Sequence, residues 1–215
     1  MNETGKSIFL IVSALFPIVN PLGGSPFFLA LTQNYSHGER RALSRRVAAN
    51  SFFLLIGSYF IGSLILGFFG ISIPVVQVAG GLVVISNGWV MLQRRDEEER
   101  REVQRNVHSQ EILRRAFYPL TLPLTVGPGS ISVAITLGAN APQRHSLDVA
   151  GIVAPIAASG AIALTIFLCY GFADRLARAL GATAMSVIMR LSSFLLVCIG
   201  VQILWNGVHA LLQMK

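Results

Sequence analysis

The chain has 215 residues, of which 53% are apolar and only 13% are charged, and its mean hydropathy is +0.63. Soluble domains carry about 25% charged residues, so this composition excludes an ordinary soluble domain. The formal net charge of +7 is not a nucleic-acid footprint either, because the positive residues gather in short segments between long apolar runs. Charged residues and histidines are absent from residues 7–36, 47–93, 116–143, 149–173 and 191–208.

These runs predict six membrane-spanning helices, because about 20 apolar residues suffice to cross the hydrocarbon core. The run 47–93 is long enough for two helices, separated by a turn at the sequence FGISIP, residues 69–74. We expect the first apolar segment to be a mature span and not a signal peptide, because no small-residue cleavage site follows it. The predicted spans are 7–32, 47–69, 73–92, 116–137, 149–172 and 184–212.

The distribution of positive charge predicts the orientation in the membrane. Apart from Arg190, all but three of the 17 lysines and arginines lie in the connections after the first, third and fifth spans. The three exceptions are Lys6, Arg144 and Lys215. Short positively charged loops stay in the cytoplasm. We therefore predict a multi-pass protein of the inner (plasma) membrane with both termini outside the cytoplasm.

The charged segment 94–115 divides the chain into two halves, 1–93 and 116–215, which resemble each other weakly. Each half begins with a span that carries paired prolines and a Gly/Pro cluster at its middle, and Gly81 and Gly88 match Ser193 and Gly200 in spacing. A unit of three spans must insert upside down when it is repeated, and the positive loops change place accordingly. The predicted fold class is an all-α integral membrane protein of six transmembrane helices. They form two inverted three-helix repeats, 1–93 and 116–215, joined by a cytoplasmic loop, 94–115.

The Pro/Gly clusters interrupt spans 1 and 4 and are the predicted substrate site. Proline removes a backbone N–H and glycine weakens helical preference, and the backbone groups freed in this way must face protein or a water-lined cavity. Matching interruptions in inverted halves are a sequence pointer to a transporter's binding site, at which helix N-termini can bind an anion. The predicted site residues of the two clusters are Asn20, Pro21, Gly23, Gly24, Ser25, Thr125, Gly127, Pro128, Gly129 and Ser130.

Two further polar residues of the last span are candidates for the same site. Arg190 is the only charge placed within a predicted span, and a cation there is a site hypothesis by default. It lies near the cytoplasmic end, so snorkelling to the headgroups explains it equally well. Gln202 is the second candidate, with interhelical hydrogen bonding as its alternative role.

The sequence offers little for catalysis. The predicted spans contain no aspartate or glutamate, and the four histidines fall in loops or at a span end. A proton-driven pump for cationic drugs usually needs a buried carboxylate. We therefore expect neither an enzyme nor a metal site, and no cofactor.

Several of these motifs together resemble the MarC family of bacterial and archaeal inner-membrane proteins. They are Asn20-Pro21-Leu22-Gly23, the turn FGISIP with Ala79-Gly80-Gly81, Pro123 with Gly127-Pro128-Gly129, and Arg190 followed by the sequence FLLVCIGVQ at 194–202. The resemblance covers nearly the whole chain except residues 94–115. It implies six spans, and some similar proteins are described as transporters of small neutral amino acids such as alanine and glycine.

The function expected is transport of small solutes, with small neutral amino acids as the favoured class, by alternating access around a midplane site. The alternatives are a membrane sensor or scaffold that acts through residues 94–115, and an exporter of drugs or metabolites; an intramembrane enzyme is the least supported. The expected partners are a small-molecule substrate and the lipid bilayer. The substrate, the direction of transport, a coupling ion and a homo-oligomeric state stay open.

Overall fold

The computed structural model describes residues 3–32, 35–93, 116–141 and 149–213, and these form helices without a strand. The helices are α1 (Glu3–Val19), α2 (Pro21–Leu31), α3 (His37–Phe68), α4 (Ile73–Gln93), η2 (Ala116–Thr125), α7 (Pro128–Ala139), α8 (Val149–Gly171) and α9 (Ala173–Gln213). The charged segment 94–115 lies outside the described residues, so the domain boundary predicted there stays a prediction.

Five helical segments of the described chain are long and apolar enough to cross a membrane. They are Glu3–Leu29, His37–Phe68, Ile73–Gln93, Gly151–Gly171 and Ser186–Gln213. The sixth predicted span, 116–137, is divided between the irregular helix η2 and the helix α7, which is apolar but only 12 residues long. The structure therefore confirms an all-helical membrane architecture with five of the six predicted spans as long apolar helices.

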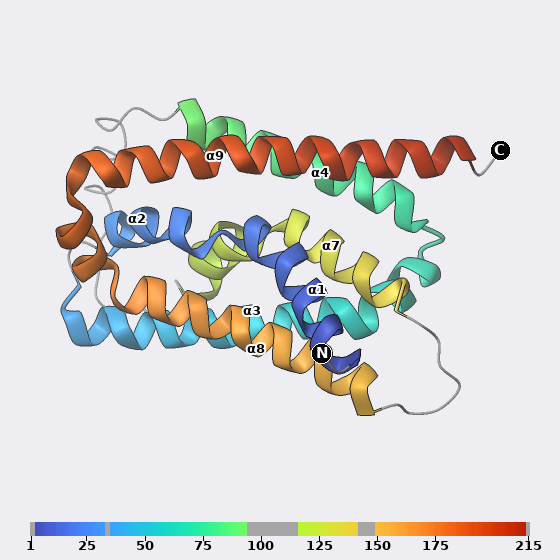
Figure 1. Ribbon diagram of the computed structural model, residues 1–215, viewed down its shortest axis with the longest axis horizontal. Helices are drawn as coiled ribbons and strands as arrows, with labels where there is room; N and C mark the ends of the chain where they lie inside the picture. Colours follow the sequence, from blue (N-terminus) through green and yellow to red (C-terminus); the bar gives the residue numbers. More distant parts are fainter. Residues whose placement is uncertain (1–2, 33–34, 94–115, 142–148, 214–215) are drawn as a thin grey trace.

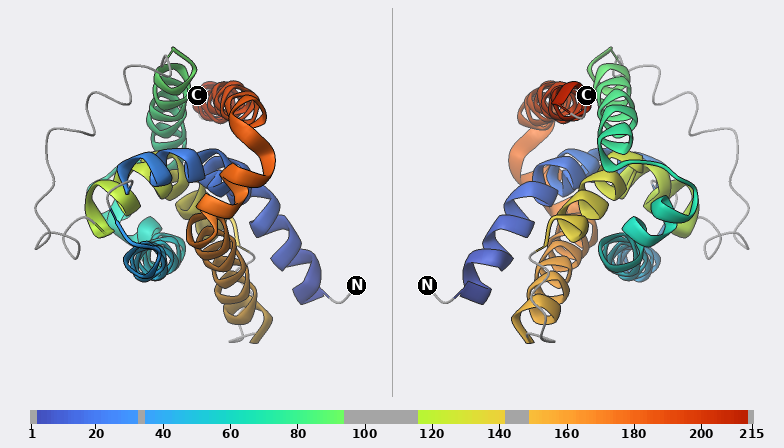
Figure 2. Two further views of the ribbon diagram at one scale, coloured as in Figure 1. Left: turned by 90° about the vertical axis from the view of Figure 1, so that its left-hand side faces the viewer. Right: turned by 90° about the vertical axis from the view of Figure 1, so that its right-hand side faces the viewer.

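The helices are arranged in three layers (Figures 1 and 2). The pair α4 and α9 forms one outer layer, the pair α3 and α8 forms the other, and the interrupted segments α1–α2 and η2–α7 lie between them. Contacts cross between the halves of the sequence: α2 packs on α8 and α9, whereas α7 packs on α3 and α4. The two interrupted segments are thus each held by helices of the opposite half.

Glycines bring α4 and α9 into backbone contact. A Cβ atom at Gly81 would lie 2.6 Å from the Leu204 nitrogen, and one at Gly200 would lie 2.7 Å from the Ile85 nitrogen. Gly88 and Gly207 approach the opposite helix in the same way and follow Gly81 and Gly200 by one spacing of seven. Small residues that let helix backbones approach closely are the usual device for packing within a membrane. The glycine spacing seen in the sequence therefore has a packing role.

Positive-φ glycines start the third helical element of each half. The predicted turn at 69–74 is confirmed, because α3 ends at Phe68, Gly70 has φ 67° and α4 begins at Ile73. In the second half, α9 begins at Ala173 and is kinked at Gly181, where φ is 76°. The apolar stretch Ser186–Gln213 beyond the kink agrees with the predicted last span, 184–212. An L side chain is strained at such angles, so glycine permits the kink between the two helical stretches of α9.

The connections lie at two opposite ends of the long axis (Figure 1). The α2–α3 connection, the end of α4 and the α8–α9 junction lie at one end. The α3–α4 turn and the C-terminal end of α9 lie at the other. The first end is where the sequence places its arginine-rich connections.

Candidate functional site

The first interruption lies at Asn20, between α1 and α2. Asn20 adopts left-handed angles, φ 46° and ψ 58°, and is the N-cap of α2. Its side-chain oxygen accepts a hydrogen bond from the Gly23 N–H at 3.1 Å, and its carbonyl accepts one from the Gly24 N–H at 2.9 Å. The residue before a proline is disfavoured in the helical region, and asparagine tolerates the left-handed one. The pair Asn20-Pro21 therefore ends one helix and starts the next.

The second interruption extends through η2 to the start of α7. Tyr118 and Leu122 have extended angles, with φ/ψ of −123°/127° and −107°/127°, and each directly precedes a proline, Pro119 or Pro123. Steric clash with a following proline ring favours exactly such extended angles. Gly127 is also extended, with φ −92° and ψ 179°, and is the N-cap of α7.

Threonine side chains repair part of the disrupted hydrogen bonding in η2. The Thr121 hydroxyl donates to the Ala116 carbonyl at 2.6 Å, and the Thr125 hydroxyl donates to the Leu120 carbonyl at 2.7 Å. Both hydroxyls are buried. Such hydroxyl bonds to main-chain carbonyls help an irregular segment to lie within the protein.

The two helix N-termini differ in how well they are capped. At α2 the Asn20 side chain accepts a hydrogen bond from the Gly23 N–H, one of the first N–H groups of the helix. At α7 the cap is Gly127, which has no side chain to accept a hydrogen bond from the first N–H groups, and Pro128 follows it. The first N–H groups of a helix lack partners within that helix. The α7 N-terminus, at Gly129 and Ser130, therefore begins without a side-chain cap, unlike that of α2.

Tyr170, near the end of α8, joins the two interruptions. Its hydroxyl lies 3.0 Å from the Thr125 hydroxyl, and a Cβ atom at Gly24 would lie only 2.5 Å from the same oxygen. Thr125 donates its single hydroxyl proton to Leu120, so Tyr170 is the donor in their contact. Its ring is fully buried and stacks on Phe28 of α2 with 4.6 Å between centroids.

The helices that follow the interruptions pack closely on the opposite half of the chain, α7 on α4 and α2 on α9. A Cβ atom at Gly129 would overlap the Val84 side chain of α4, and the Ser132 hydroxyl donates to the Val76 carbonyl at 2.9 Å. On the other side, a Cβ atom at Gly23 would lie 2.8 Å from the Ser192 Cβ atom of α9. Gly23 and Gly129 are therefore needed for helix packing whatever else they do.

The predicted site residues fall into two groups. Of those in the Pro/Gly clusters, Gly24 and Thr125 contact Tyr170, whereas Ser25 and Ser130 are buried and Pro128 is exposed. Arg190 and Gln202 are exposed residues of α9, and the contacts that join the two interruptions do not involve them. Gln202 instead donates to Asn206, one turn later, at 2.9 Å.

Sequence reasoning missed Tyr170. Its neighbour Gly171 and its position at the end of an otherwise apolar span were the only signals, and neither identifies a partner. Its contact with Gly24 arises because α8 packs on α2 of the first half, whereas Thr125 belongs to η2, in the same half as α8. For metals, the described residues contain no group of three or more histidine, cysteine, aspartate or glutamate side chains that could hold an ion.

Comparison with known proteins identifies related chains along the full length. A family model described as MarC family integral membrane protein matches residues 5–212. The chain is 32% identical over 220 residues to the inner membrane protein MarC of Citrobacter koseri. It is 32% identical over 218 residues to the proteins of that name from Salmonella typhimurium and Escherichia coli O1:K1. In each case 99% of both chains is covered. No solved structure matches the chain.

Proposed function

We propose that this chain, which belongs to the MarC family of integral membrane proteins, transports small solutes across the inner membrane. The observation that carries the proposal is the pair of proline-marked interruptions, at Asn20 and at Gly127, enclosed between the α3–α8 and α4–α9 layers. Lipid-exposed irregular backbone does not occur in the hydrocarbon region, whereas irregular backbone around a binding site does. Interrupted helices in matching positions are typical of transporter sites.

The proposal includes six spans that form two inverted repeats. Contacts between helices support this arrangement, because most of the packed pairs recur when each helix is replaced by its counterpart in the other half. The contact of α2 with α9 corresponds to that of α7 with α4, and the contact of α1 with α8 corresponds to that of η2 with α3. The α3–α8 and α4–α9 pairs are each formed by corresponding helices. In this scheme η2 and α7 together make the fourth span.

Small neutral amino acids are the substrate class that the site suits. A zwitterion needs a partner for its carboxylate, and the poorly capped N-terminus of α7 supplies backbone N–H groups and a favourable dipole. Its ammonium needs acceptors. The Pro17 carbonyl has lost its usual helical donor, because Pro21 has no N–H. Hydroxyls such as that of Ser25 add further polar groups, so no buried acid is required.

Uptake into proteoliposomes tests the proposal directly. Purified protein is reconstituted and counterflow of labelled alanine and glycine is measured against protein-free liposomes, with a bulky cationic dye as the competing substrate class. We expect saturable exchange of the amino acids and none of the dye. Absence of exchange of any small solute by correctly folded protein would contradict transport.

Arg190 provides a second test of the anion partner. We expect Arg190→Ala to lower flux at least about tenfold with unchanged expression, if this side chain binds the substrate carboxylate. Arg190→Lys should keep part of the flux, because lysine retains the charge but lacks the planar fork that suits a carboxylate. Wild-type flux in the alanine variant would instead assign Arg190 to the headgroup region, in accord with its exposure on α9.

Orientation is tested with reporter fusions. The proposal places both termini outside the cytoplasm and segment 94–115 inside, because the arginine-rich connections lie at one end of the molecule. Alkaline phosphatase fused after Lys215 should be active, and the same reporter inserted near Glu99 should be inactive. The reverse result would overturn the orientation.

A further inference from the structure

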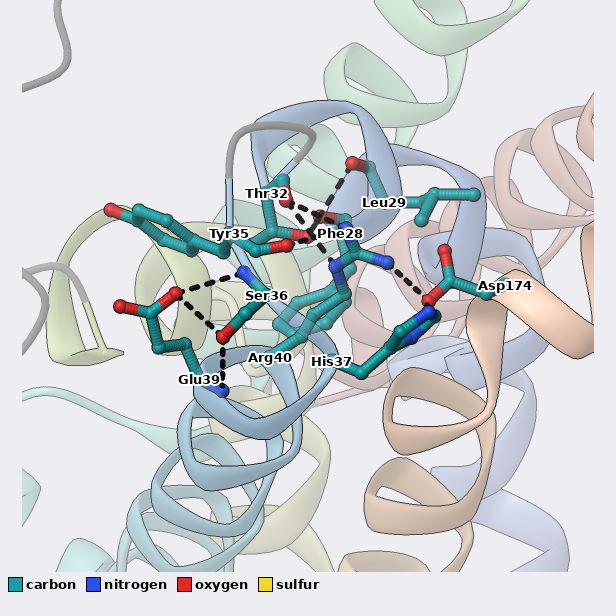
Figure 3. Close-up of polar contacts among 9 residues, drawn as sticks. All are labelled: Phe28, Leu29, Thr32, Tyr35, Ser36, His37, Glu39, Arg40 and Asp174. Atoms are coloured by element: carbon teal, nitrogen blue, oxygen red, sulfur yellow. Dashed lines mark hydrogen bonds and ion pairs between the residues drawn. The ribbon is translucent and has the colours of Figure 1, made fainter.

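Arg40, at the start of α3, is a buried cation with every side of its guanidinium in use. Its Nε and Nη2 atoms donate to the Thr32 carbonyl at 3.2 and 3.1 Å, and Nη2 also donates to the Tyr35 carbonyl at 2.9 Å. Its Nη1 atom forms an ion pair with Asp174, the second residue of α9 (Figure 3). One side chain therefore joins the end of α2, the start of α3 and the start of α9.

His37 is the outer member of the cluster. Its Nδ1 atom lies 2.9 Å from the same Asp174 oxygen, but 78% of the side chain is exposed, against 23% for Asp174 and 10% for Arg40. Solvent screens an exposed pair far more than a buried one. The Arg40–Asp174 pair is therefore the essential contact, and His37 shields its outer side.

The position of this pair relates it to the interruptions. Asp174 follows Tyr170 by four residues, and Tyr170 packs on Gly24 and Phe28 of α2. Arg40 holds the other end of α2 through the Thr32 carbonyl. The ion pair and the tyrosine contact thus hold α2 against the α8–α9 junction at two points, one after the other along the chain. Both lie toward the end of the molecule that carries the α2–α3 connection.

A buried ion pair is a device for holding a particular arrangement more than a source of net stability. Here it links residues from opposite halves of the chain. A movement of α2 away from α8, which would open the interruptions toward this end, must break this pair or the hydrogen bonds of Arg40 with Thr32. In the open arrangement water hydrates the separated charges, and this hydration offsets part of the energy lost with the ion pair. The protein can therefore reach the open arrangement.

We propose that Arg40 and Asp174 form a latch, with His37 on its exposed side, that closes this end of the molecule and opens when a solute passes to that side. The inference rests on the proposed transport function, in which this side is the cytoplasm. The latch holds the interruptions closed toward the cytoplasm in the arrangement described above.

Side-specific alkylation tests the latch without measuring transport. Cys169 and Cys198 are replaced by alanine, and Ser25→Cys places a single thiol on α2, where the serine side chain is fully buried. A membrane-impermeant maleimide is added to inside-out or right-side-out vesicles. With the latch intact the thiol should react slowly from the cytoplasmic face. Asp174→Asn should raise that rate at least tenfold while the rate from the other face stays unchanged.

Matched variants separate opening from loss of fold. His37→Ala, which removes only the exposed partner, should change the rate less than twofold. Arg40→Lys retains the charge pair but loses the planar contacts with Thr32 and Tyr35, so it should give a smaller rise, about threefold, and serves alone if Asp174→Asn does not fold. An unchanged rate in a folded variant, or an equal rise from both faces, would overturn the latch. Failure of all solute exchange with a faster, one-sided reaction would instead overturn transport and leave the latch standing.

Discussion

Replacing Gly81 with leucine is expected to force α4 away from α9 and to lower the free energy of unfolding in detergent by about 3 kcal/mol. A Cβ atom at this position would lie 2.6 Å from the Leu204 nitrogen and 2.8 Å from the Gly200 carbonyl oxygen. These are backbone atoms of a helix, so they cannot rotate aside as a side chain would. The measurement is reversible unfolding in mixed micelles, followed by circular dichroism.

Gly57 offers a matched control for this substitution. It also lies within a long helix, α3, but no atom lies within 4 Å of a Cβ atom built there. Gly57→Leu removes the same glycine and adds the same side chain, so it should leave stability unchanged or raise it, because leucine favours the helix. Similar losses in both variants would show that Gly81 is not at a close contact between α4 and α9.

Local chemistry explains why the interruptions could be predicted from sequence. Asn20, Tyr118 and Leu122 each precede a proline, and each departs from helical angles, as steric clash with the proline ring favours. Pro17, Pro26 and Pro155 lie inside helices, so the clustering of prolines with glycine or asparagine is the signal, and it acts between neighbouring residues. Gly70 and Gly181 could be placed for a similar local reason, because a positive φ favours glycine.

Contacts between residues far apart in the sequence could not be predicted in the same way. The pairs Arg40–Asp174 and Thr125–Tyr170 join residues far apart in sequence, and no periodicity relates them. Arg40 could be counted only as one of several loop arginines, although it is buried in the structure. The capping of the two helix starts is also a tertiary property, since asparagine and glycine are both common N-caps and only the geometry shows which N–H groups remain available.

Contacts also change the meaning of some predicted site residues. The sequence treats the glycines of both clusters alike, as positions where the backbone approaches a ligand. In the structure Gly129 faces the Val84 side chain and Gly23 faces Ser192, whereas Gly24 faces the Tyr170 hydroxyl. A substitution at Gly129 would therefore damage packing before it reports on binding. The informative probe is a side chain at the contact between the two interruptions that can be changed with little change in its volume.

Tyr170→Phe is that probe, and we expect it to lower solute exchange by about tenfold, which corresponds to about 1.4 kcal/mol. The ring and its stacking on Phe28 are kept, and only the hydroxyl that bonds Thr125 is removed. A solute that enters between the interruptions must replace this hydrogen bond, and the phenylalanine variant offers it no donor. Deletion of one hydrogen bond lowers stability by only about 1 kcal/mol, so exchange should fall while folding is nearly preserved.

Two controls test whether the effect is specific to the contact of Tyr170 with Thr125. Tyr59→Phe makes the same chemical change in α3, away from the contact of Tyr170 with Thr125, and should leave exchange unchanged. Thr125→Val removes the other hydroxyl of the pair. If the two hydroxyls act as one unit, the double variant should be no slower than the slower single variant. Wild-type exchange in Tyr170→Phe would show that the tyrosine only packs against Gly24, and the meeting point of the two interruptions would then contribute backbone groups alone to solute binding.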